Sequence, residues 1–313
     1  MVTTLLTFRD NIKAFCSRYD YILTPVLKFV VAMLVFFSIK QQMGYMPLFN
    51  NILVMLLLSA ICAFLPMEFT TGIGGIIIIL ESTQVALDAA LVGLALILIF
   101  YCGYMRFSPR TGIIVLLVPL CYTTHLFYAL PIVLGFLVGP AAIIPVIFGV
   151  ILYYYEMGLK ELVNVLAAVT EEDTAVQGYQ YILNALIDNK EMLLTFIVFA
   201  CVILVTYVIY RASFSNSWIV AFLAGGFLNV VLFLVGSVTL LIEVEIAPIL
   251  MGSIVGILLA VILQFGKGIV DYQRTEVLQF EDDEYYYYVK AIPKLSVSES
   301  NKNVKHINSK THN

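Results

Sequence analysis

Charged side chains are scarce in this chain. Asp, Glu, Lys and Arg together make up 12% of its 313 residues, whereas soluble domains carry about 25%. Hydrophobic residues supply 61% of the positions, and the mean hydropathy is +0.98. This composition excludes an ordinary soluble domain, and it gives no basic surface of the kind that binds nucleic acid. We therefore expect an integral membrane protein whose surroundings are the lipid bilayer.

The sequence also lacks the short motifs of several chemistries. It has no G-x-x-x-x-G-K-[ST] phosphate loop, no H-E-x-x-H, no C-x-x-C and no G-x-S-x-G. Its five cysteines are scattered, and four of them lie inside apolar runs, which favours packing over disulfides. We therefore expect no ATPase activity in this chain, no metal and no cofactor, and we predict that it is not an enzyme.

Repeated apolar runs approach the ~20 residues that a helix needs to cross a bilayer. The clearest are Tyr21 to Ile39, Ala86 to Tyr104, Met192 to Tyr210, Trp218 to Gly236 and Ala247 to Phe265. Shorter or broken runs are Leu48 to Leu65, Thr70 to Leu80, Thr111 to Thr124, Leu126 to Val138 and Pro140 to Tyr155. If residues 111–155 make one crossing plus a re-entrant hairpin, eight crossings remain instead of ten. The prediction is an all-α polytopic bundle of eight to ten transmembrane segments, some short or broken.

The basic residues indicate the orientation of the bundle, because short cytoplasmic loops collect positive charge. With the N-terminus inside, the ten-crossing arrangement places thirteen of the seventeen Lys and Arg residues in the cytoplasm. We therefore expect a multi-pass protein of the plasma membrane with both termini in the cytoplasm.

This orientation divides the chain into segments with different surroundings. Residues 1–20 form a cytoplasmic segment, and residues 21–265 form the transmembrane bundle. Within the bundle, the loop 156–191 faces outward, and its helical periodicity predicts two amphipathic extracellular helices. These helices either cover apolar surface as a lid or capture a substrate. Residues 266–297 follow as a cytoplasmic juxtamembrane segment, and residues 298–313 are polar and expected to be disordered.

Proline and glycine are concentrated in the middle third of the chain, where the apolar runs are short. Transporter sites are often built from such discontinuous helices, whose free backbone groups can coordinate a ligand. Pro140 and Pro145 are therefore candidates for a substrate path. The alternative is that they are ordinary prolines of transmembrane helices.

A few ionisable residues in the apolar zone are further substrate-path candidates, because a charge in a membrane is costly. Lys28 lies in the first run, and its stem can alternatively extend to the cytoplasmic surface. Glu81 and Asp88 flank Ser82–Gln84. If that triplet is a turn, both carboxylates reach the outer interface; if the helix continues, they share a face that suits a cation or a proton. His125 is expected to be hydrogen-bonded at an interface.

An acidic, tyrosine-rich segment follows the last apolar run. It is too polar for a bilayer and is placed to meet a soluble partner, such as a separate ATPase. Its extended-structure propensity predicts a short strand at Tyr285 to Ile292, which would pair with another segment of the chain or with the sheet edge of a partner. The alternative is an aromatic anchor at the membrane interface. The candidate docking residues are Phe280, Glu281, Asp282, Asp283, Glu284, Tyr285, Tyr286, Tyr287 and Tyr288.

The segment Gln279 to Lys294 resembles the C-terminal signature of a family of polytopic membrane proteins from clostridial and related Gram-positive bacteria. The likeness extends to Tyr21 to Phe29, Arg106 to Arg110 and Ile144 to Val150. Members are loosely labelled ABC transporter permeases, so the resemblance implies a permease-like subunit in a Gram-positive plasma membrane. It implies no substrate and no functional residues.

The sequence is therefore consistent with two functions. The first is a membrane transport component that lacks its own ATPase and is energised by a partner. The second is a non-transporting membrane scaffold for cell-envelope or surface-protein assembly. A polar cavity that reaches Lys28, Glu81 or Asp88 would favour transport, and a closed apolar bundle would favour the scaffold.

Overall fold

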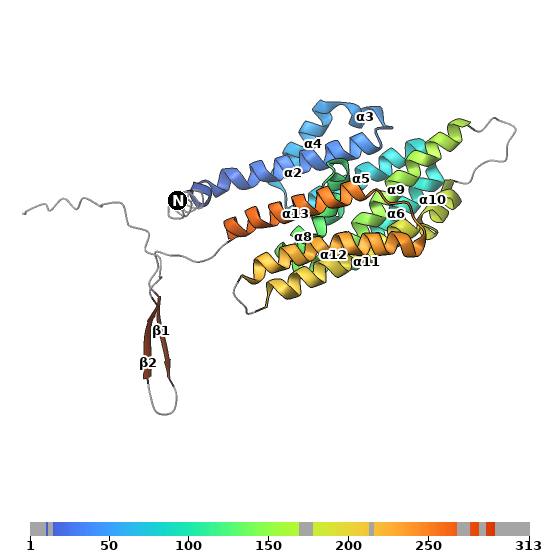
Figure 1. The fold of residues 1–313 in the computed structure, drawn as a ribbon. Coiled ribbons are helices and arrows are strands. Elements are labelled where there is room, and N and C mark those ends of the chain that lie inside the picture. The colour runs from blue at the N-terminus through green and yellow to red at the C-terminus, as the bar shows by residue number, and fades with distance from the viewer. Residues whose placement is uncertain are drawn as a thin grey trace, which may run out of the picture. The chain divides into compact units, whose positions relative to one another are not determined.

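The computed structural model describes residues 11, 15–168, 178–212, 216–267, 276–281 and 286–291. The chain divides into two units, Tyr21–Gln264 and a unit of the two ends, Met1–Asp20 with Phe265–Asn313. The described part of Tyr21–Gln264 is helical and carries the sites discussed below (Figure 1). Each unit is described by itself.

The helices follow one another with short connections. Along the chain they are α2 (Asp20–Gln42), α3 (Pro47–Asn50), α4 (Ile52–Phe64), α5 (Met67–Val85), α6 (Leu87–Phe100), the π-helical turn η1 (Tyr101–Met105), η2 (Pro109–Thr111), α7 (Ile114–Thr123), η3 (Phe127–Ala129), α8 (Leu130–Leu137), η4 (Gly139–Ala142), α9 (Ile143–Ala168), α10 (Gly178–Ile187), α11 (Lys190–Tyr210), α12 (Ser217–Leu240) and α13 (Ile246–Lys267).

Six of the described helical stretches are long and apolar enough to cross a membrane: Asp20–Gln42, Leu87–Met105, Gly139–Ala167, Lys190–Tyr210, Ser217–Leu240 and Ile246–Gly266. Five of them contain nearly all of the five clearest apolar runs, so the prediction of long apolar helices there is confirmed. Three shorter apolar helices are Ile52–Phe64, Pro109–Thr123 and Phe127–Leu137. The chain therefore has the composition and the helix lengths of a multi-pass membrane protein.

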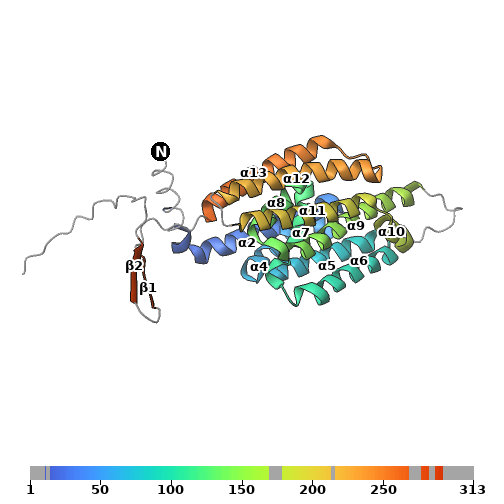
Figure 2. The ribbon, with the colours of Figure 1, turned by 60° about the horizontal axis from the view of Figure 1, so that its bottom comes forward.

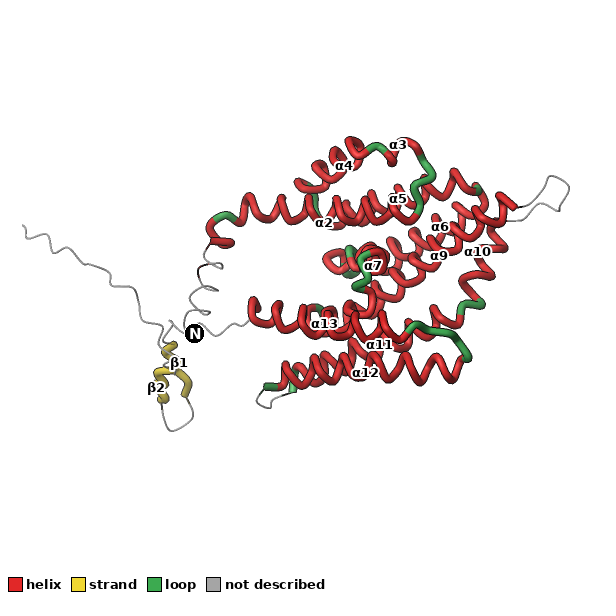
Figure 3. Tube along the Cα trace, turned by 45° about the horizontal axis from the view of Figure 1, so that its top comes forward, coloured by secondary structure: helices red, strands yellow, loops and turns green. Residues whose placement is uncertain are grey.

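The helices of this unit form three groups that lie side by side. In Figure 2, α5 and α6 lie on one side, α12 and α13 lie on the other, and α7 and α9 lie between them. Figure 3 shows α7 between the α2–α6 group and the α11–α13 group. Helix α9 of the middle group contacts α5 and α6 on one side and α11 on the other, and it contributes many buried residues to the core.

Helix α9 overturns one prediction about the loop 156–191. The first of the two expected extracellular helices is not a separate element, because α9 begins at Ile143 and continues without interruption to Ala168. Leu159 and Leu162 are both fully buried on its second half. Once a helix has begun, each further residue adds a hydrogen bond at little cost, so the polar residue Glu156 did not end it. The second expected helix is present as α10.

One break in the middle third lies at Gly139, between α8 and α9. Gly139 has a φ of +75°, a conformation that strains residues with a side chain. Pro140 is the second residue of the short helix η4, and Pro145 lies in the first turn of α9. Neither position needs a backbone N–H for a helical hydrogen bond. The two prolines therefore help to begin helices, and the glycine makes the turn.

Helices α7 and α9 approach each other closely at Gly149. A Cβ atom built at this position would lie 2.8 Å from the carbonyl oxygen of Val115 and 2.6 Å from a methyl carbon of Val118. Small residues at helix crossings permit this approach in membrane proteins. Gly149 therefore sets the spacing of the two helices that carry the site described below.

The second unit contains a β-hairpin. Strand β1 (Glu276–Glu281) pairs antiparallel with β2 (Tyr286–Ala291), in a register that places Phe280 opposite Tyr287. The predicted strand at Tyr285 to Ile292 is confirmed for the described residues, and its partner is another segment of the same chain. Residues 282–285 lie outside the described part, as does the predicted disordered tail 298–313.

Candidate functional site

Lys28 is bound to the end of a neighbouring helix. Its Nζ donates a hydrogen bond to the carbonyl of Leu65, 3.1 Å away, at the C-cap of α4. The last carbonyls of a helix have no partner within the helix and carry partial negative charge, so an ammonium group stabilises them. This contact joins α2 to the end of α4, and the extension of the Lys28 stem toward the cytoplasmic surface stays a prediction.

Glu81 is fully buried on α5 and holds the loop that follows α2. Its Oε2 accepts hydrogen bonds from the backbone N–H groups of Tyr45 and Met46, at 2.5 and 2.8 Å. Burial raises the pKa of the Tyr45 phenol, and the negative charge of Glu81 raises it further. The carboxylate therefore acts as a fixed acceptor for two donors of a distant loop.

Asp88 holds the beginning of α10. Its Oδ2 accepts a hydrogen bond of 3.0 Å from the backbone N–H of Tyr179, the second residue of that helix. The turn expected at Ser82–Gln84 is wrong, because α5 continues to Val85 and the chain reverses at the extended residue Ala86. Glu81 and Asp88 therefore lie on different helices, and each satisfies a different set of backbone donors.

The five substrate-path candidates are not brought together. Lys28, Glu81 and Asp88 each bind backbone groups, while Pro140 and Pro145 begin helical segments. None of the five lines the cavities described next.

Helix α9 places polar residues along two neighbouring stripes in the segment that follows its apolar first half. Tyr153, Glu156 and Lys160 recur at helical spacing on one stripe, and Tyr154 and Glu161 on the next. Each stripe lines its own cavity, and the side chain of Met157 borders both. These cavities are the candidate functional site.

The first cavity, called here the Glu156 cavity, has a volume of about 390 Å³. This lies within the range of roughly 300–1,000 Å³ that small-molecule sites occupy. It lies among the ends of α2 and α7, the turn after α7, and α9. Most of the lining residues carry a polar group, while apolar atoms supply the larger share of the lining surface. The residues are Gln41, Gln42, Tyr122, Thr123, His125, Tyr153, Glu156, Met157 and Lys160.

Contacts between the helices hold the walls of the Glu156 cavity. The hydroxyls of Ser38 and Thr123 are hydrogen-bonded at 3.1 Å, and Gln42 donates from Nε2 to the carbonyl of Pro119. These two contacts join α2 to α7. The rings of Tyr122 and Tyr153 lie 4.0 Å apart between centroids, which joins α7 to α9.

Glu156 is only 1% exposed, yet it lines this cavity. Within the described ranges, neither oxygen of its carboxylate has a hydrogen-bond partner. Buried carboxylates are nearly always paired or hydrogen-bonded, because an ionised group without a partner costs several kcal/mol. An unpaired carboxyl beside a polar cavity is therefore a candidate binding group.

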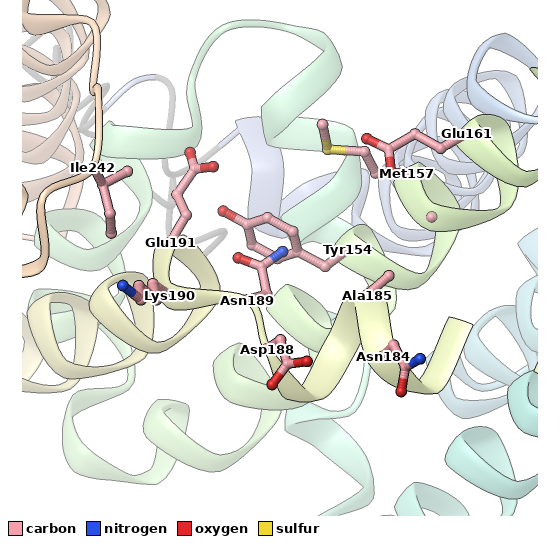
Figure 4. Close-up of a pocket in the computed structure, with 11 residues that line it drawn as sticks. Tyr154, Met157, Glu161, Asn184, Ala185, Asp188, Asn189, Lys190, Glu191 and Ile242 are labelled. Carbon is pink, nitrogen blue, oxygen red and sulfur yellow. The ribbon is translucent and has the colours of Figure 1, made fainter. Parts of the chain in front are cut away.

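The second cavity, called here the Glu191 cavity, has a volume of about 460 Å³ and lies between α9, the end of α10 and the beginning of α11. Figure 4 shows the hydroxyl of Tyr154 pointing toward the carboxylate of Glu191. Asn189 is occupied as the N-cap of α11, where its Oδ1 accepts from the N–H of Met192 at 2.8 Å. The lining residues are Tyr154, Met157, Gly158, Glu161, Asn184, Ala185, Asp188, Asn189, Lys190, Glu191 and Ile242.

Two further cavities have fewer polar groups. One, of about 330 Å³, is lined by Glu68, Phe69, Tyr101, Met105 and Arg106. The other is apolar, with a volume of about 20 Å³, and lies between α6, α7 and α9. Across the described ranges, no group of three or more His, Cys, Asp or Glu residues is placed to hold a metal ion. The chemistry available at the two cavities along α9 is thus binding by carboxyl, phenol, hydroxyl, imidazole, amide and ammonium groups.

No known protein family, no curated protein and no solved structure matches this chain.

The docking residues predicted in the acidic segment lie partly in the hairpin. Phe280 and Glu281 end β1, and Tyr286, Tyr287 and Tyr288 begin β2. The remaining four, Asp282, Asp283, Glu284 and Tyr285, lie outside the described residues.

The sequence pattern places Glu156 at the beginning of the predicted outer loop and does not indicate that this residue lines a cavity. A helical pattern that continued beyond Tyr155 was available in the sequence, since Tyr155, Leu159 and Leu162 recur at helical spacing. This pattern indicates a longer helix with Glu156 inside it. It gives no sign that the carboxyl would face the ends of α2 and α7.

Proposed function

We propose that this chain is the membrane component of a transport system, a permease-like subunit that has no ATPase of its own and takes its ligand from the outer side. The observation that carries the proposal is the buried Glu156, which has no hydrogen-bond partner among the described residues and lies beside a cavity between helix ends that is lined mostly by polar residues. A costly group of this kind in an apolar bundle is more useful for binding than for stability.

Several contacts support a topology of alternating crossings. Lys28, near the beginning of α2, meets the end of α4, and the end of α2 meets the end of α7 through Ser38 and Thr123. Near the end of α5, Glu81 meets the loop after α2. We propose that the shorter helices α4, α5, α7 and α8 reverse the chain between the longer ones, which gives eight to ten crossings and both termini in the cytoplasm. The Glu156 cavity then faces outward.

This orientation predicts a labelling result in whole cells. In a variant whose five cysteines are serines, Asp188→Cys is expected to react with a membrane-impermeant thiol reagent, because Asp188 is exposed at the outer end of α10. Arg110→Cys, an exposed position at the opposite end, is the matched control and is expected to react only after permeabilisation. The reverse pattern would invert the topology.

The scaffold remains the second candidate, and one observation favours it. The three charged residues expected along a substrate path instead bind backbone groups, as the stabilising contacts of a static bundle would. A scaffold for envelope assembly would use its outer helix α10 and its hairpin as docking surfaces.

Crosslinking in native membranes separates the two candidates. A photoreactive residue at Tyr286, at the beginning of β2, is expected to trap an ATPase subunit, because a permease without its own ATPase needs one at its cytoplasmic side. Mass spectrometry of the trapped species is the readout.

The matched control carries the same photoreactive residue at Tyr179, on α10. It is expected to trap no cytoplasmic protein. Capture of an envelope-assembly protein at Tyr286, or of lipid and the chain alone, would replace the transport proposal with the scaffold.

A further inference from the structure

Glu156 combines three properties that ordinary structural carboxylates lack together. It is buried in a long apolar helix, its two oxygens have no hydrogen-bond partner within the described residues, and its side chain borders a polar cavity. Glu81, the matched case in the same unit, is equally buried but has two backbone donors. In its observed conformation, burial without a hydrogen-bond donor from any described residue disfavours the ionised form of Glu156 relative to the neutral acid.

The groups around Glu156 show how its proton can leave. On α9 itself, Lys160 lies one turn further along, at the spacing where a glutamate and a lysine pair well, and Tyr153 precedes Glu156 by one turn. From the other elements, the cavity receives the amides of Gln41 and Gln42 on α2, the phenol of Tyr122 on α7, and His125 in the following turn. The neighbouring Tyr155 points away, toward Ser82 and Ala89. Among the described residues, Glu156 is the one carboxylate in the lining of this cavity.

We propose that Glu156 is a proton-binding site that loads and unloads through this cavity. The Oε–H bond of the buried acid breaks, and its proton passes to water in the cavity. The carboxylate then turns toward the cavity and takes the exposed ammonium of Lys160 as its counter-ion. Rebinding of a proton returns the neutral side chain to its buried position. This deepens the proposed transport function, because it makes a proton the coupled ligand.

A hydrophobic carbodiimide provides the test, since it modifies a carboxyl that is both protonated and in apolar surroundings. The full-length protein in lipid nanodiscs is treated at a series of pH values, and modification is located by mass spectrometry. Glu156 is expected to be modified at neutral pH and to lose its reactivity as the pH rises. Glu161, exposed one stripe away, is the internal control and is expected to stay unmodified at neutral pH.

Lys160 gives the second arm of the experiment. Lys160→Gln removes the counter-ion, so the protonated form is expected to persist to higher pH, with about tenfold more modification than the wild type on the alkaline side. Lys160→Arg is expected to restore the wild-type profile. Absence of modification at neutral pH would show an ionised Glu156 and overturn the proposal. Equal modification at every pH, unaffected by Lys160→Gln, would show a static buried acid and overturn it too.

These outcomes do not depend on transport. Failure of the labelling leaves the crosslinking result at Tyr286 standing, and failure of the crosslinking leaves the proton site standing.

Discussion

Replacing Glu81 with alanine is expected to lower the free energy of unfolding by about 3 kcal/mol. The Glu81 carboxylate accepts hydrogen bonds from the N–H groups of both Tyr45 and Met46, and each hydrogen bond to a charged group contributes about 1.5–3 kcal/mol. The alanine variant leaves both donors without this acceptor, although it also removes the cost of burying a carboxylate. Denaturation in mixed detergent micelles, followed by helical circular dichroism, measures the change.

The partner variant Glu81→Gln tests the cause. Glutamine keeps an acceptor oxygen at the same place but has no charge. We therefore expect Glu81→Gln to lower the free energy of unfolding by about half as much as Glu81→Ala does. Glu243→Ala removes an exposed carboxylate from the connection before α13 and is expected to have almost no effect, as surface substitutions usually do. If Glu81→Ala were as stable as Glu243→Ala, the two backbone contacts would not stabilise the fold.

Replacing Gly149 with alanine is expected to destabilise the bundle by about 1–3 kcal/mol, and Gly149→Leu by more. The added Cβ would lie 2.8 Å from the carbonyl oxygen of Val115, a backbone atom that moves only if α7 moves. The steric cost is partly offset, because alanine favours a helix over glycine by about 1 kcal/mol. The same micelle denaturation measures the result, and proton release from Glu156 should change with it.

Gly103→Ala is the matched control, because a Cβ built at Gly103 meets no atom within 4 Å. Its stability is expected to equal or exceed that of the wild type. If both alanine variants behaved alike, the close approach of α7 and α9 at Gly149 would not limit the packing.

The apolar runs were sufficient to predict most of the long helices. A run of about 20 apolar residues must satisfy its backbone groups internally in a membrane, which leaves the helix as the main solution. The ends of the runs were less informative. At Tyr155 the apolar composition stops, but the hydrogen-bond ladder of α9 continues, because buried residues such as Leu159 and Leu162 still pack on its far half.

The charged residues of the apolar zone could be identified in the sequence, but their partners were not predictable. Lys28 and Leu65 are 37 positions apart, and Asp88 and Tyr179 are 91 apart. Local patterns report which residues share a helix face and carry no information about which helix end lies opposite. Each of these contacts depends on how two distant segments pack.

The sequence by itself determined the helical character of the bundle, the places of its long apolar helices and the tyrosine-rich strand, because composition, periodicity and propensity are local. Only the tertiary structure decided that Lys28, Glu81 and Asp88 bind backbone groups, while Glu156 lies beside a cavity with no hydrogen-bond partner among the described residues. The physical reason is that burial and hydrogen-bond satisfaction belong to the packed arrangement of several helices. Glu81 in α5 and Glu156 in α9 are the same type of residue, and the groups packed around each of them give them different roles.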